Sequence, residues 1–136
     1  MKMKKMITTN KKFIIKTEDS FGEKTFEIVK GIYEINSFAN YRRYSYLSKY
    51  GDCEIIFIDN SLTITRKGVF NHTFEVFFDG KKSKFIYETE MFKEEFYSLG
   101  NNFSFNDEKC IFSFSYKLLD LNCSEVNEIN ISIKEV

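Results

Sequence analysis

Apolar and polar residues alternate along most of the chain, and this period of two is typical of β-strands with one buried face. The clearest alternation covers residues 70–78, in which every second residue is apolar or histidine. Asp79-Gly80 follows directly, and the chain then alternates again through Phe85, Tyr87 and Thr89. Because Asp-Gly between two such runs is a strong hairpin signal, the sequence predicts two antiparallel strands here.

The same alternation recurs towards both ends of the chain, and turn-forming residues separate the runs. Besides the hairpin, the predicted strands lie at residues 13–15, 26–33, 40–50, 53–58, 62–66, 96–99, 103–105, 110–118 and 129–133, with a turn expected at residues 100–102. Segments 40–50 and 91–106 are less regular than the others. We therefore expect about eight to ten strands, at intervals of roughly 8–12 residues.

This succession of short strands is typical of a sandwich or a barrel. Short antiparallel connections leave two exposed sheet edges, which closure into a barrel removes. We therefore predict an all-β fold, a closed antiparallel up-and-down barrel. Residues 91–99 offer a weaker helical alternative through Met91, Glu94, Glu95 and Ser98.

The inward face of two segments is open at this stage. Residues 40–50 alternate through Tyr44 and Tyr46, or equally through Arg43 and Leu47. The facing of residues 91–106 is equally undecided, because a single β-bulge reverses the facing of the residues that follow it.

No linker, repeat or low-complexity segment divides the chain, so we expect a single β-barrel domain over residues 11–136. Residues 1–10 are basic and lack the apolar stretch of roughly 7–15 residues that a secretory signal needs. We expect them to form a flexible N-terminal tail. Because no run of roughly 18 consecutive apolar residues occurs, we also expect no membrane span.

The charge balance and the cysteines narrow the classes of partner. The chain has 20 basic and 20 acidic residues, without the basic surplus that nucleic-acid binding requires. Its three cysteines are widely spaced and form no C-x-x-C pair. We therefore expect no nucleic-acid partner, no disulfide framework, no metal site, no cofactor and a cytoplasmic location.

Short motifs in the middle and late strands carry a family resemblance. They are Leu62-Thr63-Ile64-Thr65-Arg66-Lys67-Gly68, Phe85-Ile86-Tyr87-Glu88-Thr89 and Phe112-Ser113-Phe114-Ser115-Tyr116. Together they resemble the YwiB-like family, small bacterial proteins of unknown function with a lipocalin-like (calycin-type) barrel. The family's Arg-x-Gly falls on Arg66 and Gly68, its Tyr-x-Thr on Tyr87 and Thr89, its late aliphatic-x-Tyr on Tyr116, and its Gly-x-Tyr on Gly31 and Tyr33.

The resemblance covers roughly residues 11 to 135 and implies a closed barrel of about eight to ten strands, but no activity. Two departures from the family pattern stand out. An aromatic-Gly pair often follows the Tyr-x-Thr motif, whereas Met91-Phe92-Lys93 follows it here. The acidic residue usual in the third strand is absent from Tyr44-Ser45-Tyr46-Leu47, which removes a carboxylate that a catalytic site could use.

In the alternating strands, the residues at every second position are expected to face inwards, and we call this shared position their parity. Five residues with reactive or polar side chains have the parity of the apolar residues: Arg66, His72, Tyr87, Thr89 and Tyr116. We take these as the candidate ligand-binding residues. An inward arginine must be paired or hydrogen-bonded, since an isolated buried charge is costly. Arg66 therefore either binds an anionic ligand, with Tyr87 and Tyr116 as further donors, or satisfies backbone carbonyls at one end of the barrel and locks its closure.

His72 is the one histidine of the chain. It lacks the acidic or thiolate neighbours of a metal site, and general-base catalysis would need a nucleophile such as Cys53 or Cys110 within about 3 Å. A hydrogen-bonded core histidine is the commoner role, and Cys110 is expected to be a small core residue. We predict no catalytic residues, and a hydrolase or isomerase is the least favoured hypothesis.

The leading hypothesis is a barrel that binds a small ligand, partly apolar or anionic, in its lumen. The alternative is a structural or protein-interaction module, for example a homodimer, with a solid core and no ligand. Apolar residues expected on the outer face support this alternative. They are Ile14, Ile56, Ile58, Phe77, Ile86, Ile111 and Leu119.

Overall fold

The computed structural model describes residues 6–36 and 40–136, and all regular structure within them is β-strand. The strands are β1 (Met6–Asp19), β2 (Lys24–Asn36), β3 (Tyr41–Ser48), β4 (Gly51–Ile58), β5 (Ser61–Gly68), β6 (His72–Phe77), β7 (Ser83–Glu88), β8 (Lys93–Asn106), β9 (Ile111–Leu119) and β10 (Glu125–Glu135). Within these residues no helix is long and apolar enough to cross a membrane.

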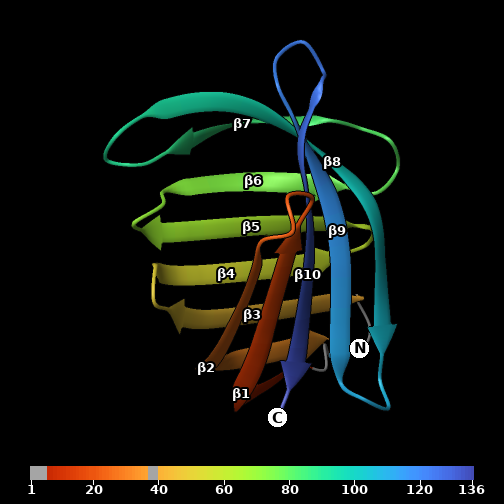
Figure 1. The fold of residues 1–136 in the computed structure, drawn as a ribbon. Helices are drawn as coiled ribbons and strands as arrows, with labels where there is room; N and C mark the ends of the chain where they lie inside the picture. The colour runs from red at the N-terminus through yellow and green to blue at the C-terminus, as the bar shows by residue number, and fades with distance from the viewer. Residues whose placement is uncertain (1–5, 37–39) are drawn as a thin grey trace.

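The strands form one antiparallel sheet in the order β6-β5-β4-β3-β2-β1-β10-β9-β8-β7. The two ends of this meander, β6 and β7, approach each other through an isolated bridge between Asn71 and Glu88, so the barrel is nearly closed. Figure 1 shows β8, β9, β10 and β1 in front, running almost perpendicular to β3–β6 behind them. The prediction of an antiparallel up-and-down barrel is confirmed.

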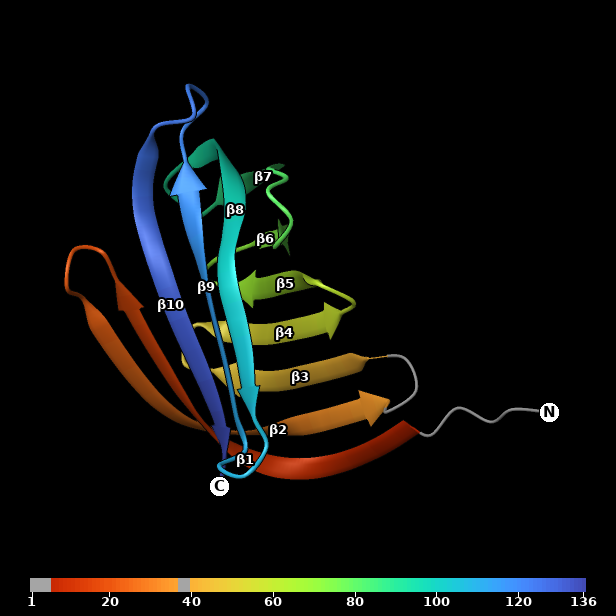
Figure 2. The same cartoon turned by 90° about the vertical axis from the view of Figure 1, so that its right-hand side faces the viewer.

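The long strands curve so that one sheet can form both layers of the barrel. Figure 2 shows the bend in β1 and β2, which run together from the hairpin tip to the opposite end of the molecule. In β8 the register shifts between Gly100 and Asn102, which marks a β-bulge. The turn predicted at residues 100–102 is therefore wrong. One continuous strand replaces the two expected short strands, and it also replaces the helical alternative.

Strand β1 begins at Met6 and pairs with β2 from its first residue, where Met6 lies opposite Asn36. Residues 6–10 are therefore part of the sheet rather than part of the predicted tail. Residues 1–5 lie outside the described residues. The hydrophobic period of β1 did not show this, because Thr8, Thr9 and Asn10 give no alternation.

The core is built mostly from aromatic side chains on the inner face. Phe57 and Phe112 are each 1% exposed, and the Phe57 ring lies 4.8 Å from that of Phe103 and 5.6 Å from that of Phe112, between centroids. The facing of residues 40–50 is also settled, since Tyr44 and Tyr46 are buried whereas Leu47 is exposed. This arrangement fills the middle of the barrel with rings.

Two expectations about individual residues are wrong. Cys110 is exposed, because it occupies the turn before β9 with a left-handed backbone angle φ of 55°. Leu119, which was expected on the outer face, is 7% exposed and pairs with Tyr97 at the end of β9. For Cys110 the alternation was extended to a residue before β9 begins, whereas Leu119 is the last residue of β9, where the register with β10 shifts between Glu125 and Asn127.

Gly31 permits the close approach of β2 and β3. A Cβ atom built there would lie 2.9 Å from Cβ of Tyr46 and closer still to the carbonyl oxygen of Ser45. We expect Gly31→Ala to lower the free energy of unfolding by about 1–3 kcal/mol through overpacking. Lys30→Ala, at the exposed neighbouring position, should change it by less than about 0.5 kcal/mol. Urea unfolding of both variants measures this, and equal midpoints for the two would contradict the assignment.

Candidate functional site

A row of paired positions crosses the inner wall of the barrel. Gly31 of β2 lies opposite Tyr46 of β3, Tyr46 opposite Cys53 of β4, Cys53 opposite Arg66 of β5, and Arg66 opposite His72 of β6. Directly paired residues of antiparallel strands lie on the same face of a sheet. The row therefore places a phenol, a thiol, a guanidinium and an imidazole side by side.

Arg66 lies at the centre of this cluster. Its side chain is half-buried, and its nearest charged or titratable neighbours include Tyr116 of β9, Cys53 and Tyr46. Burial acts to lower the pKa of Arg66, but these neighbours outweigh it and the pKa lies above its usual value. The guanidinium therefore stays charged inside the barrel.

Arg66 is unusual because its charge has no carboxylate counter-ion among the described residues. Among the described residues, no ion pair joins this guanidinium to a carboxylate within 4.0 Å. Its directly paired neighbour on β4 is Cys53, whose thiol is a weak acceptor and contributes to the raised pKa of Arg66. The expected lock onto backbone carbonyls is not among the described hydrogen bonds. The electrostatic compensation of Arg66 inside the barrel is therefore incomplete.

Arg42, by contrast, is an arginine of the same barrel that has a carboxylate partner. It lies on the same face of β3 as Tyr46, about 13 Å further along the strand. One Nη donates to Asp107 at 3.3 Å, and the guanidinium stacks over the Phe105 ring at 4.0 Å. A weaker contact reaches the Tyr33 hydroxyl at 3.5 Å. Arg42 is thus compensated by side chains of the protein itself, whereas Arg66 has no such carboxylate partner among the described residues.

His72 is buried at 8% exposure, and neither ring nitrogen has a hydrogen-bond partner among the described residues. Its ring stacks on Tyr87 at 5.1 Å and lies 5.3 Å from the Phe74 ring. Burial, together with the charge of Arg66, lowers the pKa of His72 to about 4. The residue is a neutral aromatic group near pH 7, and the hydrogen bonds expected for a core histidine are not present.

The other predicted site residues separate into two groups. Tyr116 is 2% exposed and lies near Arg66, while Tyr87 joins the cluster through His72. Thr89 lies in the turn after β7, where its hydroxyl accepts hydrogen bonds from the backbone N–H groups of Met91 and Phe92 at 3.2 Å each. Four of the five candidates are therefore brought together, and Thr89 is not.

A cavity of about 170 Å³ opens beside Arg66. It lies between the β3–β4 turn, the β5–β6 connection and the inner face of β1 and β2, towards the left of Figure 1. Its polar wall includes Arg66, Tyr46, Cys53 and Glu27, and its apolar wall is formed by Ile15, Phe70 and Ile131. Tyr116, Tyr87 and His72 are not among its lining residues.

The sequence prediction missed Tyr46, Cys53 and Glu27 as site residues. A signal for Cys53 was present, because a tight turn at Asp59-Asn60 places residues 53 and 66 opposite each other. Counting outwards from recognised turns would have aligned the whole row. Parity alone says which face a residue lies on, but not which residues on that face are neighbours.

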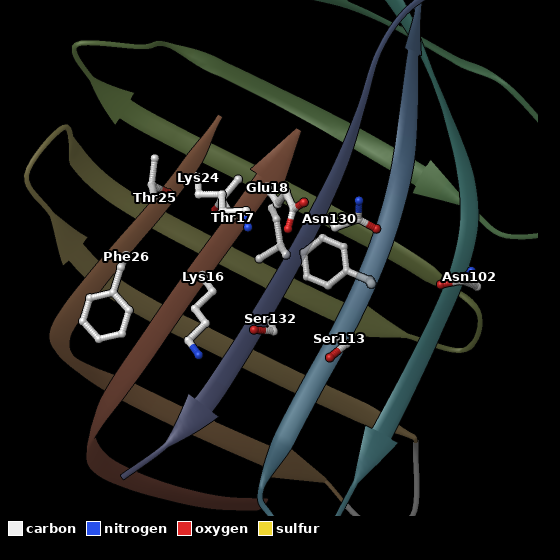
Figure 3. Close-up of a pocket in the computed structure, with 12 residues that line it drawn as sticks. Lys16, Thr17, Glu18, Lys24, Thr25, Phe26, Asn102, Ser113, Asn130 and Ser132 are labelled. Carbon is white, nitrogen blue, oxygen red and sulfur yellow. The ribbon is translucent and has the colours of Figure 1, made fainter. Parts of the chain in front are cut away.

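A larger hollow of about 520 Å³ lies on the front strands (Figure 3). Lys16 is paired with Ser132, and Ser132 with Ser113, so these three lie across β1, β10 and β9. Their parity is opposite to that of the buried Ile131 and Phe114. These three residues form the outer part of its wall, whereas Thr17, Thr25 and Ile131 also line the Arg66 cavity, so the two hollows adjoin.

Within the described residues, no group of three or more histidine, cysteine, aspartate and glutamate side chains could hold a metal ion. Cys53, Cys110 and Cys123 are all free thiols. The chemistry available in the Arg66 cavity is therefore that of a cation, a carboxylate, a phenol and a thiol.

These features define a class of protein: a ten-stranded, nearly closed antiparallel barrel with a charged cavity at one end. The solved structure of the YwiB protein from Bacillus subtilis has a similar fold, with a TM-score of 0.68 over 96% of this chain and 95% of that chain. This confirms the resemblance at the level of the fold, which is what 15% sequence identity can show. No family model and no curated protein matches the sequence.

The depressed pKa of His72 makes a prediction about stability. The folded pKa of about 4 lies below the usual 6.5, so the unfolded chain binds the extra proton between these values. The contribution of His72 to stability is fully present above about pH 6.5 and is lost as the pH falls towards 4. We expect wild type to lose about 2–3 kcal/mol more than His72→Phe between pH 7 and pH 4.

Urea unfolding of both proteins over this pH range measures the difference, since the carboxylates contribute equally to each. The imidazole resonances can also be followed directly, because the chain has a single histidine. Parallel pH profiles, or an imidazole that titrates near pH 6.5 in the folded protein, would contradict the assignment.

Proposed function

We propose that the protein binds a small anionic ligand, with a carboxylate or phosphate group, in the Arg66 cavity. The observation that carries this proposal is the Arg66 guanidinium, which lines a cavity and forms no ion pair with a carboxylate of the described residues. Removing such a charge from water is costly unless an anion compensates it. A planar guanidinium is also well suited to bidentate binding of these groups.

The surroundings of Arg66 support the same ligand chemistry. Tyr46 lines the cavity, and burial raises the pKa of its hydroxyl well above the usual value, so the hydroxyl keeps its proton as a hydrogen-bond donor. Ile15 and Ile131 offer an apolar surface to the rest of the ligand. We also propose that the barrel works in a lipocalin-like manner and in the cytoplasm, where three free thiols would persist.

The cavity limits the size of this ligand. Typical sites for drug-sized molecules measure roughly 300–1,000 Å³, whereas this one has about 170 Å³. The aromatic rings that fill the centre of the barrel leave the ligand at one end rather than in a long lumen. We therefore propose a ligand with few heavy atoms.

The alternative function, a protein-interaction module, has a separate basis in the outer surface. Ile58 and Ile86 are 41% and 49% exposed, in agreement with their expected outward facing. A homodimer through this surface would show as twice the monomer mass in light scattering. It would not require the Arg66 cavity, so the two functions are tested independently.

Titration of the full chain with acetate, propionate and inorganic phosphate tests the ligand proposal. Arg66 is one of three arginines, so its Nε–H resonance can be followed by NMR. We expect this resonance to shift on binding, and the midpoint of thermal unfolding to rise with ligand concentration. Arg66→Gln should lose at least about tenfold in affinity.

Arg43→Gln is the matched control. Arg43 is paired with Glu54 at 2.8 Å and with Glu34 at 3.6 Å, and is not among the lining residues of the cavity. This variant should bind the anions as wild type does. Equal binding by wild type and Arg66→Gln, or no response of wild type to any of the anions, would overturn the proposal.

A further inference from the structure

The Arg66 cavity contains a second charge that anion binding alone does not use. Glu27 of β2 shares the inward parity of Val29 and Tyr33, which are buried, and it lines the same cavity as Arg66. Asp52 also borders the cavity, but it has the outward parity of Glu54. Glu27 is therefore the inward carboxylate that lines the same cavity as Arg66.

Glu27 is held in place by the turn at the mouth of the cavity. Its Oε2 accepts a hydrogen bond from the backbone N–H of Lys49 at 3.3 Å. The carboxylate also acts on the Tyr46 hydroxyl, whose pKa is raised first by burial, then by Cys53, and in smaller part by Glu27. Glu27 is thus positioned next to the polar row rather than free in solvent.

The two charges do not neutralise each other directly. No ion pair within 4.0 Å joins Glu27 to Arg66 among the described residues. They are instead brought from different strands, β2 and β5, to two parts of one wall. Opposite charges held apart on a concave surface are complementary to a molecule that carries both charges itself.

We propose that the ligand of this cavity is a small zwitterion of the amino-acid type. Its carboxylate binds Arg66 and the Tyr46 hydroxyl, and its ammonium group binds Glu27. The short apolar part of the molecule packs against Ile15 and Ile131. This inference rests on the proposed function, because it assigns the anionic end of the ligand to the same guanidinium.

The cavity volume agrees with a ligand of this size. About 170 Å³ is the share of liquid volume that five or six water molecules occupy. A zwitterion that replaces those waters satisfies both side chains with charged hydrogen bonds, which are stronger than neutral ones. A simple carboxylate would satisfy Arg66 but would leave Glu27 without a cation.

The test compares matched pairs of ligands on the full chain. Glycine, β-alanine and γ-aminobutyrate are titrated alongside acetate, propionate and butyrate, which lack the amino group. We expect the best amino acid to bind wild type at least about tenfold more tightly than its matched carboxylate. The series also measures which spacing of the two charges fits the cavity.

Glu27→Gln should reduce this preference to less than about threefold while keeping carboxylate binding, since glutamine can still accept the hydrogen bond from Lys49. Glu23→Gln is the control, because Glu23 is exposed in the β1–β2 turn and does not line the cavity. It should retain the full preference.

The outcomes separate the two proposals. If wild type binds carboxylates and amino acids equally well, or if Glu27→Gln keeps the preference, the zwitterion inference is wrong and anion binding stands. If wild type binds neither series, both proposals are wrong. If amino acids bind but Arg66→Gln binds them equally well, the assignment of the carboxylate end is wrong.

Discussion

The charge of Arg66 on the inner wall of the barrel is the constraint from which the account of function follows. A guanidinium cannot lose its proton at neutral pH, so the protein must compensate the charge or admit something that does. The barrel compensates its other inward arginine, Arg42, with Asp107 and an aromatic ring. At Arg66 it supplies a thiol, nearby phenols and a cavity instead. This difference between two arginines of one fold separates a structural role from a binding role.

The register of the sheet places other polar side chains next to Arg66 and so forms the site. Tight turns on either side of β4 align Tyr46, Cys53 and Arg66 across three strands. The same arrangement places His72 beside Arg66, where burial and the positive charge together keep the imidazole neutral. The site thus contains one guanidinium beside a neutral imidazole, a thiol and phenols, with the Glu27 carboxylate in the same cavity. Such a wall is suited to binding and orienting a ligand.

Much of the fold could be predicted from the sequence, because alternation and turn residues are local signals. These signals predicted the strands, their antiparallel order and the inward facing of Arg66 and His72. They failed at Gly100, where a bulge continues β8 past a glycine, and at Cys110, where a turn interrupts the parity. A bulge depends on the partner strand, so no local pattern reports it.

The site was harder to predict than the fold because it depends on which inward residues are neighbours. Arg66 was identified from its parity, but Glu27 lies on β2, three strands away in the sheet from β5. Only closure and twist of the barrel bring both to one cavity. Thr89 was predicted from its parity but does not reach the cluster. Strand β7 ends at Glu88, and the Thr89 hydroxyl accepts hydrogen bonds within the turn that follows.

The central claim is that Arg66 is kept for a ligand and not for the stability of the barrel. The free energy of unfolding of Arg66→Met, measured in urea without any added ligand, tests this most directly. If the guanidinium awaits an anion, an apolar side chain of similar length should leave the protein as stable as wild type or more stable. A loss of more than about 2 kcal/mol would show instead that Arg66 holds the barrel together, and would contradict the account.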